Sequence, residues 1–280
     1  MKQKIIALLT DFGLSDHFVG TMKGVILNVD PKIRIYDISH HIQPQNILEA
    51  AYTLIDTLPY WPKGTIFVTV VDPGVGTNRR SIVVKSGSGH YIICPDNGLI
   101  TLVEQKFGLE EIREISEEKN RLPGSESSYT FHGRDIYAYN AARLASRKTT
   151  FEKMGDIAEK SIEKLSLRQA FFIEGNIFGN IVKIEKPFGN LCTNIPMNLL
   201  SNSGLNYGDS IHYVISESGT KRLEGELPLV KTFGDVNIYS ALTYIDSSGR
   251  LGFSINQGDF SDYFQIGAGL AWEVQIKKPV

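Results

Sequence analysis

Residues 70–80 read VVDPGVGTNRR and close an apolar run that covers residues 65–71. An apolar, β-branched run that ends in an aspartate and a glycine-rich turn is typical of a buried strand in an α/β sheet, where functional groups commonly lie at strand ends. The two glycines allow a sharp turn and let a ligand approach the backbone. Asp72 and Arg79 stand at the two ends of this loop, so we expect their side chains to face each other and the carboxylate to stay ionised.

The same pattern occurs twice more, because the apolar runs at 5–9 and 91–94 also lead into turns that contain glycine. The aspartates that follow the three runs are Asp11, Asp72 and Asp96. A single aspartate in such a place usually caps a helix. Three of them in one half of the chain favour a polar site at the carboxyl edge of one sheet.

The first half of the chain alternates between strand and helix patterns. Apolar runs predict strands at 5–9, 33–38, 65–71, 81–85 and 91–94. Apolar residues at helical spacing predict helices at 18–29, 46–58, 99–107 and 136–146. Polar residues at 119–128 predict a surface loop. This alternation predicts an α/β domain with a mostly parallel sheet between helices.

The second half has a different texture. Charged residues dominate between 154 and 167, and few helical patterns follow. Strand-like runs occur at 170–184, 210–214, 236–244 and 251–255, separated by turns rich in Gly, Asn, Asp and Ser. We therefore predict two domains, an α/β domain at 1–160 and a mainly antiparallel, all-β domain at 168–280.

Composition and length exclude several classes of protein. The chain has 280 residues and a net charge of −2, so no basic field favours nucleic acid. Its N-terminal apolar run is only about six residues long, too short for a signal peptide or a membrane span. Cys94 and Cys192 lack CxxC spacing and are expected to be buried free thiols. We therefore expect a cytoplasmic protein that binds neither nucleic acid nor membrane.

Common catalytic and cofactor motifs are missing from the sequence. It contains neither the GxxxxGK[ST] phosphate loop nor the GxGxxG dinucleotide motif, and no GxSxG nucleophile elbow. The adjacent His40 and His41 lack the HxxxH or HExxH spacing that places two imidazoles on one helix face. We expect no metal and no cofactor.

Among the six histidines, His132 is the most suggestive, because it lies in the sequence FHGRD just before a predicted helix. A histidine there can be a core or capping residue. Its ordinary pKa near neutrality equally suits it to transfer a proton. The sequence leaves these two alternatives open.

A third polar stretch, KPFGNLCTNI at 186–195, lies in the predicted β domain. The ring of Phe188 could stack on a planar base, and asparagine amides can hydrogen-bond both edges of a heterocycle. The simpler alternative is a β-turn with a core phenylalanine. The segments 247–249 and 255–258 likewise read first as hairpin turns and second as ligand loops.

Together these segments resemble one family, the S-adenosylmethionine (SAM) hydroxide adenosyltransferases, or SAM hydrolases, which are related to bacterial fluorinating and chlorinating enzymes. The resemblance runs in order through nearly the whole chain. The matching segments are 9–13, 71–80, 95–99, 131–135, 187–195 and 256–258.

The resemblance implies an α/β domain, a β-barrel-like domain and a homotrimer whose sites lie where one subunit's first domain meets the next subunit's second. It implies hydrolysis of SAM to adenosine and L-methionine. The hydrolase branch is marked by an Asp-Arg-His trio, which falls on Asp72, Arg79 and His132. In the halogenating relatives a tyrosine takes the place of Asp72, and in the fluorinating enzyme a halide-binding serine takes the place of Gly133. An intact trio therefore favours water as the nucleophile.

The resemblance also assigns residues to the substrate. Asp11 would accept hydrogen bonds from both ribose hydroxyls, because a carboxylate is purely an acceptor. The positions implied for the rest of the substrate are Asp16, Glu185 and Ser247 at the methionine end, Asn190 at the ribose or adenine, Phe188 and Phe233 beside the base, and the backbone near Gln257 at the adenine edge.

Two alternatives to hydrolysis stay open at this point. A halide adenosyltransferase would form 5′-halo-5′-deoxyadenosine from the same substrate. A non-catalytic nucleoside-binding protein would bind adenosine tightly without turning SAM over.

Overall fold

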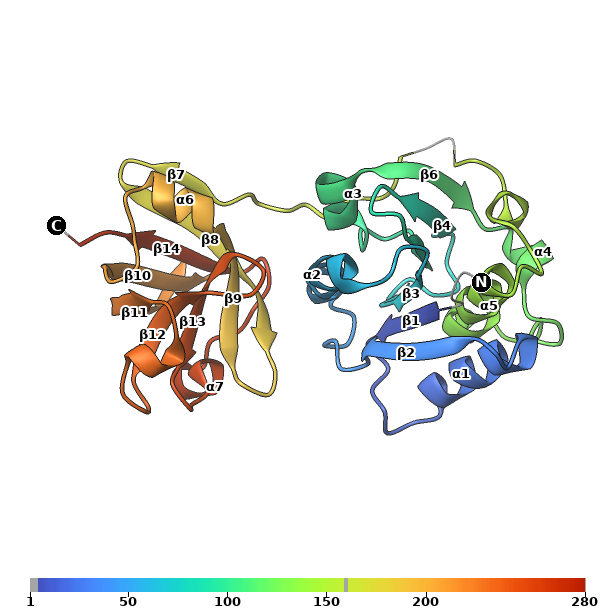
Figure 1. Cartoon of the computed structure of the whole chain (residues 1–280), viewed down its shortest axis with the longest axis horizontal. Helices are drawn as coiled ribbons and strands as arrows, with labels where there is room; N and C mark the ends of the chain where they lie inside the picture. The colour runs from blue at the N-terminus through green and yellow to red at the C-terminus, as the bar shows by residue number, and fades with distance from the viewer. Residues whose placement is uncertain (1–4, 159–160, 280) are drawn as a thin grey trace. The chain divides into compact units, whose positions relative to one another are not determined.

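A computed structural model describes residues 5–158 and 161–279 of the chain. The chain divides into two compact units, Met1–Leu165 and Ser166–Val280, which are described in turn (Figure 1). No helix within the described ranges is both long enough and apolar enough to span a membrane.

Unit 1 is built on a six-stranded sheet with the order β2-β1-β3-β5-β4-β6. The strands are β1 (Ile5–Thr10), β2 (Arg34–Ser39), β3 (Ile66–Val70), β4 (Ser81–Ser86), β5 (Tyr91–Pro95) and β6 (Leu109–Glu114). The pairs β1–β2, β1–β3 and β3–β5 are parallel, whereas β4 is antiparallel to both of its neighbours. Every residue of β1 and β3 is buried, as expected for central strands covered on both faces. The predicted α/β domain with a mostly parallel sheet is confirmed.

Helices cover both faces of this sheet (Figure 1). They are α1 (Phe18–Val29), α2 (Ile47–Thr57), α3 (Thr101–Phe107), α4 (Glu117–Asn120) and α5 (Tyr139–Ala145), with the short turns η1 (Leu58–Tyr60), η2 (Gly133–Ala138) and η3 (Phe151–Met154). α1 packs on α5, and α2 packs on α3. α2 begins where the Asn46 side chain accepts a hydrogen bond from the Glu49 amide at 3.0 Å, a standard N-cap. The segment η2 has wide, π-helical turns.

Unit 2 is a β-sheet that closes on itself. The strand order is β14-β10-β11-β12-β13-β9-β8-β7, and β14 also pairs with β8, so the sheet forms a barrel with β7 appended. The strands are β7 (Phe171–Ile173), β8 (Asn176–Glu185), β9 (Asn190–Pro196), β10 (Ser210–Glu217), β11 (Thr220–Val230), β12 (Ala241–Ile245), β13 (Arg250–Ile255) and β14 (Trp272–Lys277). Apolar side chains such as Phe253 and Phe260 fill its core. The predicted all-β, barrel-like domain is confirmed.

Several elements of unit 2 differ from the sequence prediction. The single run predicted at 170–184 is a hairpin, because Glu174 and Gly175 turn the chain with φ of 49° and 78°. The strand predicted at 236–244 begins only at Ala241, after the turn η4 (Phe233–Asp235). β9, β11 and β14 were not predicted as strands, nor were the short helices α6 (Met197–Asn202) and α7 (Phe260–Phe264).

Candidate functional site

The loop that follows β3 is folded tightly by its own hydrogen bonds. The Thr77 hydroxyl donates to the Gly74 carbonyl at 2.7 Å, and the Val75 amide donates to the Asp72 carbonyl at 3.2 Å. Gly76 has a φ of +76°, and a Cβ there would lie 3.1 Å from the Tyr129 carbonyl oxygen. Any side chain at position 76 would therefore be strained, and the tight turn brings Arg79 back toward Asp72.

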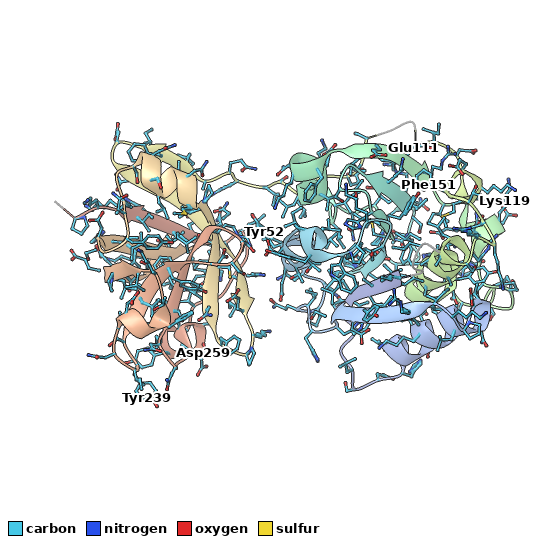
Figure 2. All side chains as sticks on the ribbon, viewed as in Figure 1. Tyr52, Glu111, Lys119, Phe151, Tyr239 and Asp259 are labelled. Carbon is cyan, nitrogen blue, oxygen red and sulfur yellow. The ribbon has the colours of Figure 1, made fainter. Side chains whose placement is uncertain are left out.

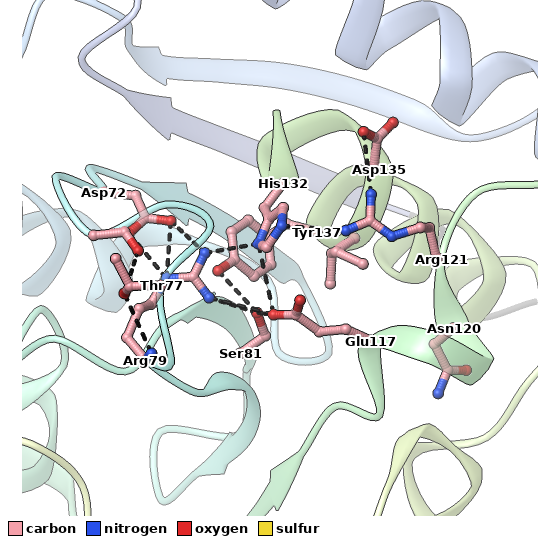
Figure 3. A network of polar contacts seen from close by, with 12 residues as sticks. Asp72, Thr77, Arg79, Ser81, Glu117, Asn120, Arg121, His132, Asp135 and Tyr137 are labelled. Carbon is pink, nitrogen blue, oxygen red and sulfur yellow. Dashed lines mark hydrogen bonds and ion pairs between the residues drawn. The ribbon is translucent and has the colours of Figure 1, made fainter. Parts of the chain in front are cut away.

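Because the loop folds back, Asp72 and Arg79 face each other. Arg79 Nε lies 3.0 Å from Asp72 Oδ1, and Arg79 Nη2 lies 2.6 Å from Asp72 Oδ2 (Figure 3). The side chains are 10% and 5% exposed, respectively. A forked, nearly buried contact of this kind fixes the orientation of both groups. The pairing expected from the loop is present.

The same guanidinium reaches the histidine. Arg79 Nη2 lies 2.8 Å from His132 Nδ1, and Arg121 Nη2 lies 3.2 Å from His132 Nε2. A guanidinium only donates, whereas a neutral imidazole accepts at one nitrogen and donates at the other. Both contacts cannot be good hydrogen bonds at once, and the shorter one favours Nδ1 as the acceptor. The three side chains singled out by the resemblance therefore converge.

The surroundings of His132 disfavour its protonated form. Burial lowers the pKa of the imidazole below its ordinary 6.5, and the cations Arg79 and Arg121 lower it further, whereas Glu117 and Asp72 oppose this. The side chain is only 2% exposed. The imidazole is therefore neutral at neutral pH, the form that can accept a proton.

Four residues of this network are absent from the sequence prediction: Ser81, Glu117, Arg121 and Tyr137. Ser81 Oγ accepts from Arg79 Nη1 at 2.9 Å and lies 2.5 Å from Glu117 Oε1 and 3.0 Å from the Tyr137 hydroxyl. Burial raises the pKa of Tyr137 well above its usual value, so the phenol is a neutral donor. No motif marks these positions.

The loop predicted at 119–128 is only partly a surface loop. Its first two residues include the end of α4, and the Arg121 side chain is 6% exposed. Arg121 lies over the Tyr129 ring at 4.6 Å and pairs with the buried Asp135 at 3.6 Å. A charged residue in a polar stretch of sequence is expected to be exposed to solvent, and only the fold shows that Arg121 has a buried partner, Asp135.

Aromatic packing brings the loop after β1 against the histidine. The Phe131 ring lies 5.9 Å from Phe12 and 5.2 Å from Phe18 in edge-on contacts. A Cβ at position 133 would lie 3.1 Å from the Phe12 ring, so a residue with a side chain fits there only if the ring moves. Gly133 therefore lets the segment that carries Asp11 approach the segment that carries His132.

The other two strand-end aspartates, Asp11 and Asp96, and the loop residue Asp16 have different surroundings from Asp72. Asp11 Oδ2 accepts from the Gln45 amide at 2.8 Å; burial raises the pKa of Asp11, the Gln45 amide opposes this rise, and the charge of Asp72 adds to it. Asp96 is buried and pairs with Arg80 Nε at 2.9 Å, which makes it a structural ion pair. Asp16 is exposed, and its carboxylate contacts the amide and the ring of His17, each at 2.6 Å.

Unit 2 contains a pocket of about 890 Å³. All the residues that the resemblance assigned to the second domain line it: Glu185, Phe188, Asn190, Phe233, Ser247 and Gln257. Phe188 is 66% exposed, so the alternative of a core phenylalanine at this position is wrong. An apolar ring beside amide and carboxylate groups suits a planar, polar ligand.

Polar contacts hold the floor of this pocket. Asn190 Nδ2 donates to Glu185 Oε2 at 3.1 Å, and the Ser254 hydroxyl donates to Asn190 Oδ1 at 2.5 Å. The Tyr244 hydroxyl lies 3.4 Å from the same Glu185 oxygen, and burial raises the pKa of this tyrosine. The Phe233 ring packs on Tyr244 at 5.0 Å. These contacts fix the amide of Asn190, which is itself 6% exposed.

Gly189 lies between the pocket residues Phe188 and Asn190, and its backbone packs closely against Asp259. It has a φ of +69°, and a Cβ there would lie 1.8 Å from Asp259 Oδ1, at the N-cap of α7 (Figure 2). We expect Gly189→Ala to lower the free energy of unfolding by about 2 kcal/mol more than Gly204→Ala, which shares the positive φ but faces open space. Urea unfolding of both variants measures this difference, and equal losses would contradict the clash.

No group of three or more His, Cys, Asp or Glu residues that could hold a metal occurs in the described parts of the chain. Cys94 and Cys192 are buried free thiols, as predicted, and burial raises the pKa of both.

Comparisons with known proteins agree with this architecture. Residues 6–155 match the model of the SAM hydroxide adenosyltransferase N-terminal domain, and residues 179–273 match that of the C-terminal domain. The (R)-S-adenosyl-L-methionine hydrolase of Methanocaldococcus jannaschii is 41% identical over 191 residues, which cover 66% of this chain and 69% of the relative.

Two further similarities extend over almost the full length. A fluorinase of Nocardia brasiliensis is 30% identical over 98% of each chain. The crystal structure of an uncharacterized conserved protein from Thermotoga maritima matches with a TM-score of 0.88 at 35% identity, and covers 98% of this chain and 100% of that one. Since both domain models match in order, the chain belongs to the SAM hydroxide adenosyltransferase family.

Proposed function

We propose that this protein is an enzyme that hydrolyses SAM to adenosine and L-methionine. The observation that carries the proposal is the convergence of Asp72, Arg79 and His132 in one nearly buried network (Figure 3). The relatives named (R)-S-adenosyl-L-methionine hydrolase support the same reaction.

In the reaction, the oxygen of one water forms a bond to C5′ of the ribose. The C5′–S bond breaks, and its electron pair goes to the sulfonium sulfur, which leaves as the neutral thioether of methionine. Water is a weak nucleophile, with a pKa of about 15.7, so it must be held in line and lose a proton as it attacks. Asp72 and His132 are the two candidate acceptors of that proton, and we assign it to the pair.

Arg79 orients the two proton acceptors and supplies a positive charge beside them. Its guanidinium contacts both Asp72 and His132, so it orients the two acceptors and stabilises hydroxide character on the attacking water. Gly133 leaves no side chain where a halide-binding serine would stand, which favours water over halide.

Substrate binding is assigned to two sets of residues. Asp11 accepts the ribose hydroxyls, and Asp16 with Glu185 and Ser247 binds the methionine end. In the unit 2 pocket, Asn190 meets the ribose or adenine and Gln257 the adenine edge. Phe188 and Phe233 flank the base. We propose a homotrimer in which these sets come from neighbouring subunits, as the family resemblance implies. The buried free thiols fit the reducing cytoplasm.

Asp11→Asn should separate binding from stability. Because burial raises the pKa of Asp11, its ionised form costs stability at neutral pH, a cost that disappears below the ordinary pKa of 3.8. We expect the asparagine variant to unfold at a slightly higher temperature, while KM for SAM rises by about tenfold or more through the lost charged acceptor. Calorimetry and steady-state kinetics measure both. A less stable variant with unchanged KM would contradict this assignment.

The function is tested by incubating the purified protein with SAM and separating the products by liquid chromatography. We expect adenosine and methionine in equal amounts, with or without added chloride or fluoride. Formation of 5′-halo-5′-deoxyadenosine would instead identify a halide adenosyltransferase. Tight adenosine binding without turnover would identify a nucleoside-binding protein.

A further inference from the structure

Hydrolysis of SAM releases one proton, because a sulfonium cation and water become two neutral products. His132 is only 2% exposed, so a proton placed on its ring has no direct access to bulk water. A complete cycle therefore needs a group that carries this proton to solvent before the next water is activated. This inference rests on the function proposed above.

Glu117 stands between the histidine and solvent. Its Oε1 lies 3.6 Å from His132 Nδ1, and its side chain is 31% exposed (Figure 3). Glu117 also lines a cavity of about 800 Å³ in unit 1, together with Arg79 and Ser81. One carboxylate thus faces the buried imidazole on one side and an open cavity on the other. We propose that Glu117 is a proton-relay residue that takes the proton from His132 Nδ1 and releases it into this cavity.

The hydrogen-bond pattern around Nδ1 explains when the transfer occurs. While the imidazole is neutral, Nδ1 accepts from Arg79 Nη2 at 2.8 Å. When His132 takes a proton, Nδ1 carries a hydrogen, and the guanidinium can no longer donate to it. The carboxylate oxygen at 3.6 Å then becomes the favourable partner for Nδ1. The N–H bond breaks, its electron pair stays on nitrogen, and the proton passes to Glu117 Oε1.

Neighbouring groups hold the receiving oxygen in place. The Ser81 hydroxyl donates to Glu117 Oε1, and Ser81 accepts in turn from Arg79 Nη1 at 2.9 Å. Tyr137, whose phenol stays neutral, donates to Ser81 at 3.0 Å. This chain of donors points toward Glu117, as expected for an acceptor that must stay oriented between cycles.

Glu117→Gln tests the relay, because glutamine keeps the size and the acceptor oxygen but cannot take up the proton. We expect kcat to fall by about tenfold or more with KM for SAM unchanged, and kcat to rise with buffer concentration as external bases replace the relay. Glu117→Ala should be rescued by formate, which fits the adjoining cavity. The exposed neighbour Glu118 lines the same cavity, so Glu118→Gln is the matched control and should behave like the wild type.

A purely structural role would lower activity without buffer dependence or formate rescue, and that result overturns the relay. So does a Glu117→Gln variant with wild-type kcat. Circular dichroism of each variant checks that the fold is intact. The proposed function fails separately, if the wild-type protein itself releases no adenosine.

Discussion

Replacing Asp72 with asparagine should lower kcat for adenosine release by on the order of a hundredfold to a thousandfold. The carboxylate binds Arg79 through both oxygens, at distances from 2.6 to 3.1 Å, in a site where its own side chain is 5% exposed. Asparagine keeps one acceptor oxygen but turns an NH₂ group toward the guanidinium. Arg79 then loses the contact that aims it at His132, and the attacking water loses a candidate base.

The chain offers a matched control for this variant. Arg80, directly before β4, and Asp96, directly after β5, form a second arginine–aspartate pair, and the Asp96 side chain is 1% exposed. Asp96→Asn should destabilise the protein to a similar extent while leaving kcat near the wild-type value. Quantifying adenosine by chromatography, with urea unfolding in parallel, separates the two effects. Similar losses of kcat in both variants would show that Asp72 acts only through stability.

Asp72 and His132 should also act as a unit. If both serve one water, the double variant Asp72→Asn/His132→Gln should be scarcely slower than the slower single variant, because groups that share one catalytic step are strongly non-additive. Multiplicative losses would mean that the two residues support different steps.

The second large effect is on the pH profile. His132→Gln should lower kcat by about a hundredfold or more, since the proton acceptor is lost.

In the wild type, activity should persist as the pH falls below 6.5, because burial, Arg79 and Arg121 lower the pKa of His132. The same shift means that the unfolded chain takes up a proton first as pH falls through 6.5, so stability also declines in that window.

Arg121 provides the specific test of this electrostatic account. Arg121→Gln removes a cation 3.2 Å from Nε2, so the pKa of His132 should rise and the acid limb of kcat/KM should move to higher pH. Asp135 keeps its pairing with Arg134 at 2.6 Å, so no orphaned carboxylate confuses the result. The control Arg134→Gln should leave the limb in place. If the acid limb of kcat/KM lies at the same pH in the wild type and in both variants, Arg121 does not lower the pKa of His132.

The sequence predicted most elements of unit 1, because their patterns are local, but it did not predict β6 or α4. The strands β1 and β3 are continuous apolar runs, and α1 follows helical spacing at the predicted bounds. Unit 2 was harder. In β14 (Trp272–Lys277), apolar and polar residues alternate, but over only six residues. β11 carries charged residues along an exposed face. Such strands are defined by their partners across the sheet more than by their own composition.

The site shows the same limit. The residues taken from the resemblance, among them Asp72 and His132, lie in recognisable segments. Glu117 and Arg121 lie in a charged stretch that predicts only solvent exposure, and their roles depend on contacts with residues distant in sequence. Whether a polar side chain is buried against a catalytic group is a tertiary property, so periodicity and spacing could not reveal it.

The central claim is that water attacks C5′ of SAM in this protein. Turnover in H₂¹⁸O, followed by mass spectrometry of the adenosine, tests it most directly. We predict that one ¹⁸O atom enters the 5′-hydroxyl of each adenosine, and that Asp72→Asn suppresses formation of this labelled product. Unlabelled adenosine, or no adenosine from a folded wild-type protein, would contradict the account.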